Sequence, residues 1–518
     1  MKHAIAILGA LAALQAAHAQ KTSPVQIESG ALTGTIEAGV RAYKGVPYAA
    51  APIGALRWEP PQPAVHWPGT LNAVSPGRAC PQTKSPGRDI VKYGGAPEPT
   101  GEDCLTLNVW APIAATKAPV MVWIHGGAGR MGSGSLPYYD GTTFARDGIV
   151  LLTINYRLGN LGSFAHPAIT RAARKDEPLI QYAMMDQIAV LQWVQRNIAA
   201  FGGDPHNVTL FGESAGGLST LVLMTSDRTA GLFHKAIVES GGGWFPPSSL
   251  EDAEKCGVEV ASKLGLAGAE ATPTQLRALS VQQLDDAGQI CSANVDGRLF
   301  RDQPTIAFAA GRAADIPLLI GINSGEDTLL DIGGIEKAKS TLMNGSQGKS
   351  ARELYGSDMD DETLVRSLFR DSLFVAPARW LAALSWRTQP TYLYYFDYVD
   401  EAQRPARRSA PHGSDVFHVF ETFAVRPDGE PAATAADLSM GSVMHACWVG
   451  FAKTGHPTCA GADPWTPYTR EADSWMVFSA RGAHIEPIPN AARLDKVEGR
   501  VSWALWLGRI KAALSRWF

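Results

Sequence analysis

The chain has 518 residues and a nearly balanced charge, with 46 lysines and arginines against 50 aspartates and glutamates and a formal net charge of −4. Hydrophobic residues make up 45% of the sequence and charged residues 19%, which provides enough apolar material for a large core and argues against a disordered chain. Because no long basic run occurs, the composition also argues against nucleic-acid binding.

The N-terminal residues 1–19 match the three regions of a secretory signal peptide. Lys2 precedes an apolar run at residues 4–14, and the small residues Ala17 and Ala19 follow it. The run is shorter than the ~20 apolar residues that span a bilayer, and no later segment reaches that length, so we expect no stable membrane insertion. We predict cleavage after Ala19 and a secreted or periplasmic mature protein.

Six cysteines fit an exported protein, because disulfides form and persist in oxidising compartments. They are Cys80, Cys104, Cys256, Cys291, Cys447 and Cys459. Their even number permits complete pairing, and we favour pairing in sequence order. The first two bracket a stretch rich in glycine and proline, and the last two are near neighbours in the chain. The alternative for Cys447, which adjoins Trp448 on an expected helix, is a free buried thiol.

Apolar patterning predicts several strands in the first third of the mature chain. Period-two alternation predicts a β-hairpin at residues 25–27 and 32–36, and a turn-rich crossing follows at residues 43–49. Alternation also predicts a strand at residues 105–110. Continuous apolar runs, typical of strands buried on both faces, occupy residues 119–125 and 149–156.

Helices and strands alternate in the remainder of the chain. Amphipathic spacing predicts a helix at residues 186–200, and a short strand at residues 208–211 leads into a helical pattern. Further strands are expected at residues 235–240, 316–321 and 391–396. This order predicts an α/β fold with a central, mostly parallel sheet flanked by helices. Helical insertions are expected at residues 249–290 and 333–388, where they would form a lid or the walls of a gorge.

No linker interrupts this pattern, so we predict a single domain over residues 20–518. The C-terminal segment 501–518 has tryptophan, leucine and isoleucine side chains spaced for one helical face. We favour a helix packed on the core there over a helix lying on a membrane surface.

The stretch at residues 212–217 places a serine between glycines at the turn from a buried strand into a helix. Gly212 and Gly216 remove the side chains that would clash where the backbone doubles back, which leaves the Ser214 hydroxyl exposed at a helix N-terminus. This pattern is the nucleophile elbow. On its own it is short enough to occur as an ordinary glycine–serine turn.

A serine nucleophile needs a base, a carboxylate that orients the base, and donors for the oxyanion. The glycine-rich residues 125–129 directly follow a buried strand, where backbone N–H groups can point to the top of the sheet. The N–H of Ala215, next to Ser214, is a further donor.

Several longer motifs accompany these residues in a fixed order. The chain resembles the type-B carboxylesterases, relatives of the cholinesterases, over nearly all of its mature length, and the resemblance implies the α/β-hydrolase fold. The motifs that carry it are residues 43–49, 102–109, 125–128, 155–159, 201–205 and 212–217.

The resemblance also implies the triad and the oxyanion hole. Glu326 follows an expected core strand and matches the family's acid, while His412 lies in a segment similar to the family's histidine loop. Asp327 stands where the family usually has glycine and is a rival for the acid. For His418 and His445 we expect structural roles. The oxyanion donors implied are the N–H groups of Gly127, Ala128 and Ala215.

Three further residues are candidates for the substrate pocket. Gly129 stands where the family often has a bulky apolar residue, which would leave room for the acyl or alcohol group. Arg130 would place a cation at the rim, although most such arginines are solvated surface residues. Trp244 matches where the family lines its acyl pocket, and its alternative role is core packing.

These observations predict a serine carboxylesterase that hydrolyses small-molecule esters through an acyl-enzyme intermediate. No metal or organic cofactor is expected, because no histidine, cysteine or carboxylate cluster has ligand spacing. The alternatives are a non-catalytic cholinesterase-like binding protein and an interfacial lipase. The joint presence of Ser214, Glu326 and His412 favours the enzyme, while the sequence pattern specifies neither the ester nor the oligomeric state.

Overall fold

The computed structural model describes residues 20–82, 94–97, 99–244, 249–292, 295–343, 346–385, 388–426 and 429–500. The predicted signal peptide at residues 1–19 and the predicted helix at residues 501–518 lie outside this part of the chain.

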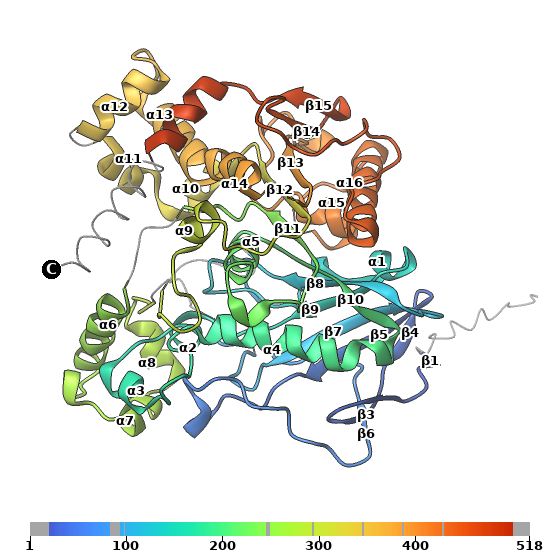
Figure 1. The fold of residues 1–518 in the computed structure, drawn as a ribbon, viewed down its shortest axis with the longest axis vertical. Coiled ribbons are helices and arrows are strands. Elements are labelled where there is room, and N and C mark those ends of the chain that lie inside the picture. The colour runs from blue at the N-terminus through green and yellow to red at the C-terminus, as the bar shows by residue number, and fades with distance from the viewer. Residues whose placement is uncertain are drawn as a thin grey trace, which may run out of the picture.

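A large sheet forms the centre of the molecule (Figure 1). Every pair of neighbours from β9 to β14 is parallel, while the pairs at both edges are antiparallel. The prediction of a mostly parallel sheet is therefore confirmed. Within the described residues the sheet has 12 strands, which lie in the order β1 (Gln20–Lys21), β4 (Thr35–Glu37), β5 (Val40–Pro47), β7 (Thr106–Pro112), β9 (Val150–Ile154), β8 (Ala118–Ile124), β10 (Gly203–Glu213), β11 (Lys235–Glu239), β12 (Leu318–Asn323), β13 (Thr391–Phe396), β14 (Ser474–Ser479) and β15 (Gly482–Pro487).

The N-terminal strands depart from the prediction at two glycines. The expected strand at residues 32–36 divides at Gly34, where a side-chain Cβ would lie 2.0 Å from the Ala42 carbonyl oxygen. Its first half pairs in a small separate sheet, and its second half becomes β4 of the large one. The prediction of a turn-rich crossing at residues 43–49 is wrong, because β5 continues through Gly45. Gly45 has a φ of +72° at a bulge in the pairing with β7. The small sheet comprises β2 (Val25–Ile27), β3 (Gly30–Thr33) and β6 (Thr70–Asn72).

Both faces of the large sheet are buried under helices. Successive side chains of its central strands point to opposite faces, so one strand contributes to the core on each side. In β8, Val122 belongs to one hydrophobic cluster together with Trp193. The next residue, Trp123, belongs to a second cluster together with Trp448. This two-sided burial explains the continuous apolar run of β8. The main covering helices are α4 (Tyr182–Asn197), α5 (Ala215–Leu223), α14 (Ala376–Ser385) and α16 (Ala435–Thr454).

The two predicted insertions are helical. One separates β11 from β12 and the other separates β12 from β13, and Figure 1 shows both on the left of the sheet, one below and one above. A role of these helices as a lid or gorge stays a prediction. The first insertion contains α6 (Leu250–Lys263), α7 (Pro273–Arg277) and α8 (Val281–Asp286), and the second contains α10 (Leu329–Gly333), α11 (Ile335–Met343), α12 (Ser346–Tyr355), α13 (Asp361–Arg370) and α14.

The cysteines pair in sequence order, as predicted, and the alternative of a free thiol at Cys447 is wrong. Three disulfides are typical of proteins outside the cytoplasm. No helix among the described residues combines the length and the apolar character that crossing a bilayer requires. The disulfides join Cys80 to Cys104, Cys256 to Cys291 and Cys447 to Cys459.

A buried ion pair fixes the chain after β9. The Arg157 guanidinium donates to both carboxylate oxygens of Asp186, on α4, at 2.7 and 2.8 Å. The side chains are 3% and 0% exposed. Arg157 also donates to the Glu59 carbonyl oxygen at 2.9 Å. The pair therefore joins α4 to the segment that precedes α2 (Gly159–Gly162).

Asp186→Asn should destabilise the protein by about 3 kcal/mol, because it leaves the buried Arg157 charge uncompensated. Chemical denaturation followed by tryptophan fluorescence measures the loss. The control is Glu251→Gln, which removes an exposed pair with Lys255 and should change the free energy of unfolding by less than about 0.5 kcal/mol. Equal effects of the two substitutions would contradict the prediction.

Candidate active site

Ser214 lies at a strained turn between β10, which ends at Glu213, and α5, which begins at Ala215. Its φ of 54° and ψ of −120° are unfavourable for a residue with a side chain. Two backbone hydrogen bonds hold the turn. The Ser214 N–H donates to the Glu239 carbonyl oxygen at 2.8 Å, and the Leu218 N–H donates to the Ser214 carbonyl oxygen at 2.9 Å.

The glycines on either side of Ser214 permit this turn. A Cβ at Gly216 would lie 1.9 Å from the Ile124 carbonyl oxygen, and a Cβ at Gly212 would lie 2.6 Å from the same atom. Neither distance is tolerable, since β8 cannot retreat without breaking the sheet. The prediction that both positions need glycine for steric reasons is therefore confirmed.

Glu326 follows β12 and is fully buried. One of its carboxylate oxygens, Oε2, hydrogen-bonds with His412 Nδ1. The other, Oε1, accepts from the Ser240 hydroxyl at 2.5 Å and from the Asn323 N–H at 2.8 Å. These bonds fix the orientation of the carboxylate, which in turn fixes the plane of the imidazole.

Backbone contacts align the glutamate loop with the histidine loop. The Gly325 N–H donates to the Ala410 carbonyl oxygen at 2.8 Å, and the Ala410 N–H donates to the Ser324 hydroxyl at 2.8 Å. The His412 N–H donates to the Thr328 hydroxyl at 3.2 Å. The two loops, about 86 residues apart in sequence, are thus held side by side.

Asp327, the rival acid, faces a different partner. Its carboxylate lies 3.5 Å from the Arg366 guanidinium, which also donates to the Asp327 carbonyl oxygen at 3.3 Å. The structure therefore brings Glu326 to His412 and directs Asp327 elsewhere. His418 and His445 contact the carbonyl oxygens of Ser414 and Val419, at 3.3 and 2.7 Å, as expected of structural histidines.

Sequence reasoning missed a second carboxylate at the histidine. Glu213 Oε1 lies 3.1 Å from His412 Nε2, and the Glu213 side chain is 9% exposed. Burial raises the pKa of Glu213 to about 8, and the neighbouring Asp415 and Glu326 add to the increase, against the opposing effect of His412. The only sequence signal was the place of Glu213 directly before Ser214.

The charge of the surrounding groups also changes the acidity of His412. Burial by itself lowers the pKa of His412, but the carboxylates of Glu326 and Glu213 outweigh it and raise the pKa to about 9. The imidazole thus lies between two carboxylates, one at each ring nitrogen.

The glycine loop after β8 packs directly against the serine. A Cβ at Gly126 would lie 3.1 Å from the Ser214 Cβ and 2.6 Å from Glu213 Oε2. His125 is buried and stacks on Tyr156, with ring centroids 4.4 Å apart. Burial lowers the pKa of His125 to about 4, so this histidine is neutral and structural at neutral pH.

The predicted oxyanion donors lie on both sides of Ser214. Gly127 and Ala128 have φ values of +95° and +57°, which turn the loop sharply after Gly126. Within the described residues their N–H groups have no acceptor. The Ala215 N–H is at the first position of α5, where helix geometry leaves it without an intrahelical partner.

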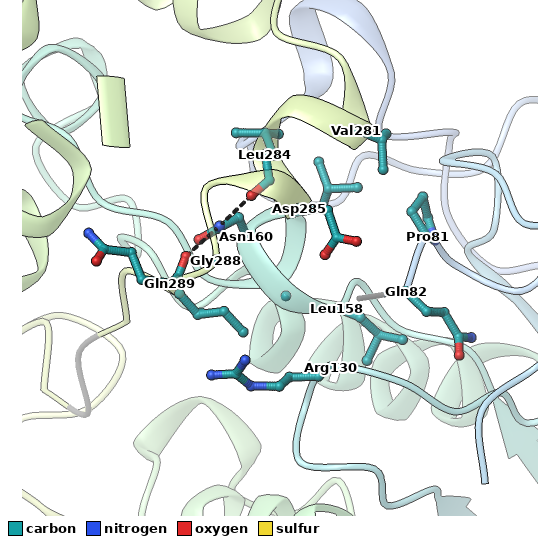
Figure 2. Close-up of a pocket in the computed structure, with 13 residues that line it drawn as sticks. Pro81, Gln82, Arg130, Leu158, Asn160, Val281, Leu284, Asp285, Gly288 and Gln289 are labelled. Atoms are coloured by element: carbon teal, nitrogen blue, oxygen red, sulfur yellow. Dashed lines mark hydrogen bonds between the residues drawn. The ribbon is translucent and has the colours of Figure 1, made fainter. Parts of the chain in front are cut away.

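The pocket candidates lie in two places. Trp244 packs edge-on against Trp380 of α14, with ring centroids 6.0 Å apart. Its role in an acyl pocket stays a prediction. Arg130 lines a pocket next to the glycine loop, together with Gln82, Asn160 and Asp285 (Figure 2). The space beside Gly129 is open, since a Cβ there would meet no atom within 4 Å.

Among the residues that the structure describes, no group of three or more histidine, cysteine, aspartate or glutamate side chains is arranged to hold a metal ion. The residues brought together here present a hydroxyl, an imidazole, carboxylates and backbone N–H groups. Such a set can carry out acyl transfer.

Comparisons with known proteins agree with this chemistry. A family model described as "Carboxylesterase family" matches residues 21–496. Fumonisin B1 esterase of Sphingopyxis macrogoltabida is 34% identical, over 93% of this chain and 92% of its own. Para-nitrobenzyl esterase of Bacillus subtilis (strain 168) is 32% identical, over 91% of this chain and 98% of its own.

Solved structures give the same result. A PNB esterase aligns with a TM-score of 0.78 at 31% identity, over 92% of this chain and 99% of its own. A carboxylesterase of Geobacillus stearothermophilus aligns with a TM-score of 0.77 at 32% identity, over 91% of this chain and 99% of its own. The fold is that of an α/β-hydrolase. The chain belongs to the carboxylesterase family, and its named relatives are esterases, which supports carboxylic ester hydrolase activity.

Replacing His412's partner should reveal which acid orients it. Glu326→Gln should lower kcat/KM for a p-nitrophenyl ester by roughly 10³–10⁴, because the imidazole loses the carboxylate that holds its tautomer. The matched control is Asp327→Asn, one residue later, which should change kcat/KM by less than about threefold. A larger loss in Asp327→Asn than in Glu326→Gln would reverse the assignment.

Glu213→Gln should shift the pH dependence of activity. The predicted role of His412 as the base requires a neutral imidazole, so kcat/KM should rise with pH as His412 deprotonates, with an apparent pKa above 6.5 in the wild type. Removing the Glu213 charge makes the imidazolium less stable. The rise should therefore move to lower pH, by about one unit. A pH profile that stays in place or moves to higher pH would contradict this account. The control is Glu362→Gln, on the exposed surface of α13.

Proposed function

We propose that the chain is a serine carboxylesterase with Ser214 as nucleophile, His412 as general base and Glu326 as the residue that orients His412. The observation that carries this proposal is the hydrogen bond between Glu326 and His412, whose Nε2 lies 3.1 Å from Glu213, the residue directly before Ser214. In the reaction, Ser214 Oγ attacks the ester carbonyl carbon while His412 Nε2 takes the hydroxyl proton. His412 then returns this proton to the leaving alcohol.

The oxyanion of each tetrahedral intermediate would accept hydrogen bonds from the N–H groups of Gly127, Ala128 and Ala215. These donors are fixed by the backbone, so they need no reorganisation as charge develops. Water, activated by His412, then hydrolyses the acyl-enzyme and releases the acid. The names of the relatives, among them a fumonisin B1 esterase and a para-nitrobenzyl esterase, support an ester as the substrate.

Ser214→Ala should lower the kcat for p-nitrophenyl butyrate by roughly 10⁴–10⁶, because no other group in the site can form the acyl-enzyme. The wild type, but not Ser214→Ala, should gain the mass of one phosphoryl group when treated with an organophosphate. Ser219→Ala, in the same helix, is the control for folding and should keep both properties. Equal activity of wild type and Ser214→Ala would refute the mechanism.

The two alternatives give different results in the same assays. A non-catalytic binding protein would show neither hydrolysis nor phosphorylation. An interfacial lipase would show a sharp rise in rate above the solubility limit of the ester, whereas an esterase acting on dissolved substrate saturates below it. The combination of Ser214, Glu326 and His412 favours the esterase.

We further propose that the protein is exported and that its leader is removed after Ala19. The three disulfides and the signal-like composition of residues 1–19 support this proposal. N-terminal sequencing of the protein recovered from the periplasm or medium of an expressing bacterium should begin at Gln20. A protein that retains residues 1–19 in the cytoplasm would contradict the proposal.

A further inference from the structure

Figure 2 shows a pocket between the segment that follows the glycine loop and the first helical insertion. Arg130 lines it and follows Ala128 by only two residues, a backbone span of at most about 7 Å. The opposite wall is α8, which contributes Leu284 and Asp285. The residue that lines the pocket and the predicted oxyanion donor Ala128 therefore belong to the same short loop.

The floor of the pocket is tied to the glycine loop by hydrogen bonds. The Gly159 N–H donates to the Gly129 carbonyl oxygen at 2.8 Å. On the other side, the Gln82 side chain donates to the Gly132 carbonyl oxygen at 2.6 Å and accepts from the Gly132 N–H at 3.1 Å. Movement of the pocket floor would therefore move the loop that carries Gly127 and Ala128.

The far wall is held by one buried side chain, Asn160. Its amide nitrogen donates to the carbonyl oxygens of Leu284 and Gln289 at 3.2 and 2.8 Å, and its amide oxygen accepts from the Cys291 N–H at 3.2 Å. Figure 2 shows the two amide donations as dashed lines. The disulfide between Cys291 and Cys256 fastens the same segment to α6. The pocket is thus preformed, which lowers the entropic cost of binding.

The two charged side chains that line the pocket differ in whether they already have a partner within the protein. The Arg130 side chain is exposed, and its guanidinium has no partner among the described residues. Asp285, across the pocket, already has an interaction of its own. Of these two charged side chains, the one without a partner among the described residues is therefore the positive one. A guanidinium binds a carboxylate through two parallel N–H donors, a geometry that combines charge with direction.

We propose that this pocket selects esters that carry a carboxylate, and that Arg130 is the specificity-determining residue that binds it. This inference rests on the proposed esterase function and specifies its substrate class. The charged group lies away from the scissile bond, on the acyl or the alcohol half of the ester. Because Arg130 contacts it in the ground state and the transition state alike, the contribution appears mainly in KM.

The test compares matched charged and neutral esters with the full-length mature protein. For the acyl half, the pair is mono-4-nitrophenyl glutarate and 4-nitrophenyl pentanoate. For the alcohol half, it is the acetate of 4-carboxybenzyl alcohol and that of 4-methylbenzyl alcohol. Arg130→Gln should lower kcat/KM for the charged member of at least one pair by roughly tenfold, mainly through KM, and should leave its neutral member within about twofold.

Three companion variants separate a specific contact from a general change of charge or shape. Arg130→Lys should recover part of the preference, because it restores the charge without the two-pronged geometry. Asp285→Asn should raise or maintain kcat/KM for the charged ester, opposite to Arg130→Gln. Arg146→Gln removes the same charge at the C-terminal end of α1 (Thr142–Arg146), outside this pocket, and should change neither pair.

Ionic strength provides an independent measurement. Raising the salt concentration from 0.1 to 1 M shortens the screening length from about 10 to about 3 Å, so the preference for the charged ester should fall in the wild type and stay flat in Arg130→Gln.

Failure of this inference differs from failure of the proposed function. If the wild type hydrolyses neutral esters through Ser214, and Arg130→Gln changes charged and neutral members equally or not at all in both pairs, the carboxylate site is refuted and the esterase stands. If no ester is hydrolysed and no organophosphate labels Ser214, the proposed function itself fails.

Discussion

The close approach of α5 to β8 is the constraint on which the site depends. The helix begins so near the Ile124 carbonyl oxygen that Gly216 has no room for a Cβ, and this proximity forces Ser214 into its unfavourable φ and ψ. The strained backbone conformation persists because the surrounding sheet, which is large, mostly parallel and buried on both faces, stabilises the fold around it. The same proximity brings Gly126 against the serine, so one steric condition aligns the candidate nucleophile with the candidate oxyanion loop.

Electrostatics add a second layer to this arrangement. His412 lies between Glu326 and Glu213, both withdrawn from water, so each carboxylate acts on the imidazole with little screening. Glu326 is held by hydrogen bonds from Ser240 and Asn323, whereas Glu213 acts through the short distance between its carboxylate and His412 Nε2. One carboxylate is thus suited to orienting the imidazole and the other to adjusting its proton affinity.

The sequence predicted the features that depend on local pattern. β8 and β9 were recognisable because strands buried on both faces are continuously apolar, and the turn at Ser214 because only glycine fits beside it. β5 was not recognisable as one continuous strand, since Gly45 at a bulge looks like a turn when its partner strand is unknown. Glu326 and His412 were assigned by resemblance, and their roles stay predictions. Glu213 was missed because its contact with His412 joins residues about 199 positions apart, which no local pattern encodes. The walls of the Arg130 pocket come from four separate segments for the same reason.

The bond between Cys256 and Cys291 has a practical consequence for preparing this protein. It fastens the wall that Asn160 holds, whereas the turn at Ser214 relies on glycines and backbone hydrogen bonds alone. Chain produced in a reducing cytosol would therefore keep the turn at Ser214 while losing part of the frame around the Arg130 pocket. Two preparations with the same sequence would then differ in the wall of that pocket, according to the compartment in which each had folded.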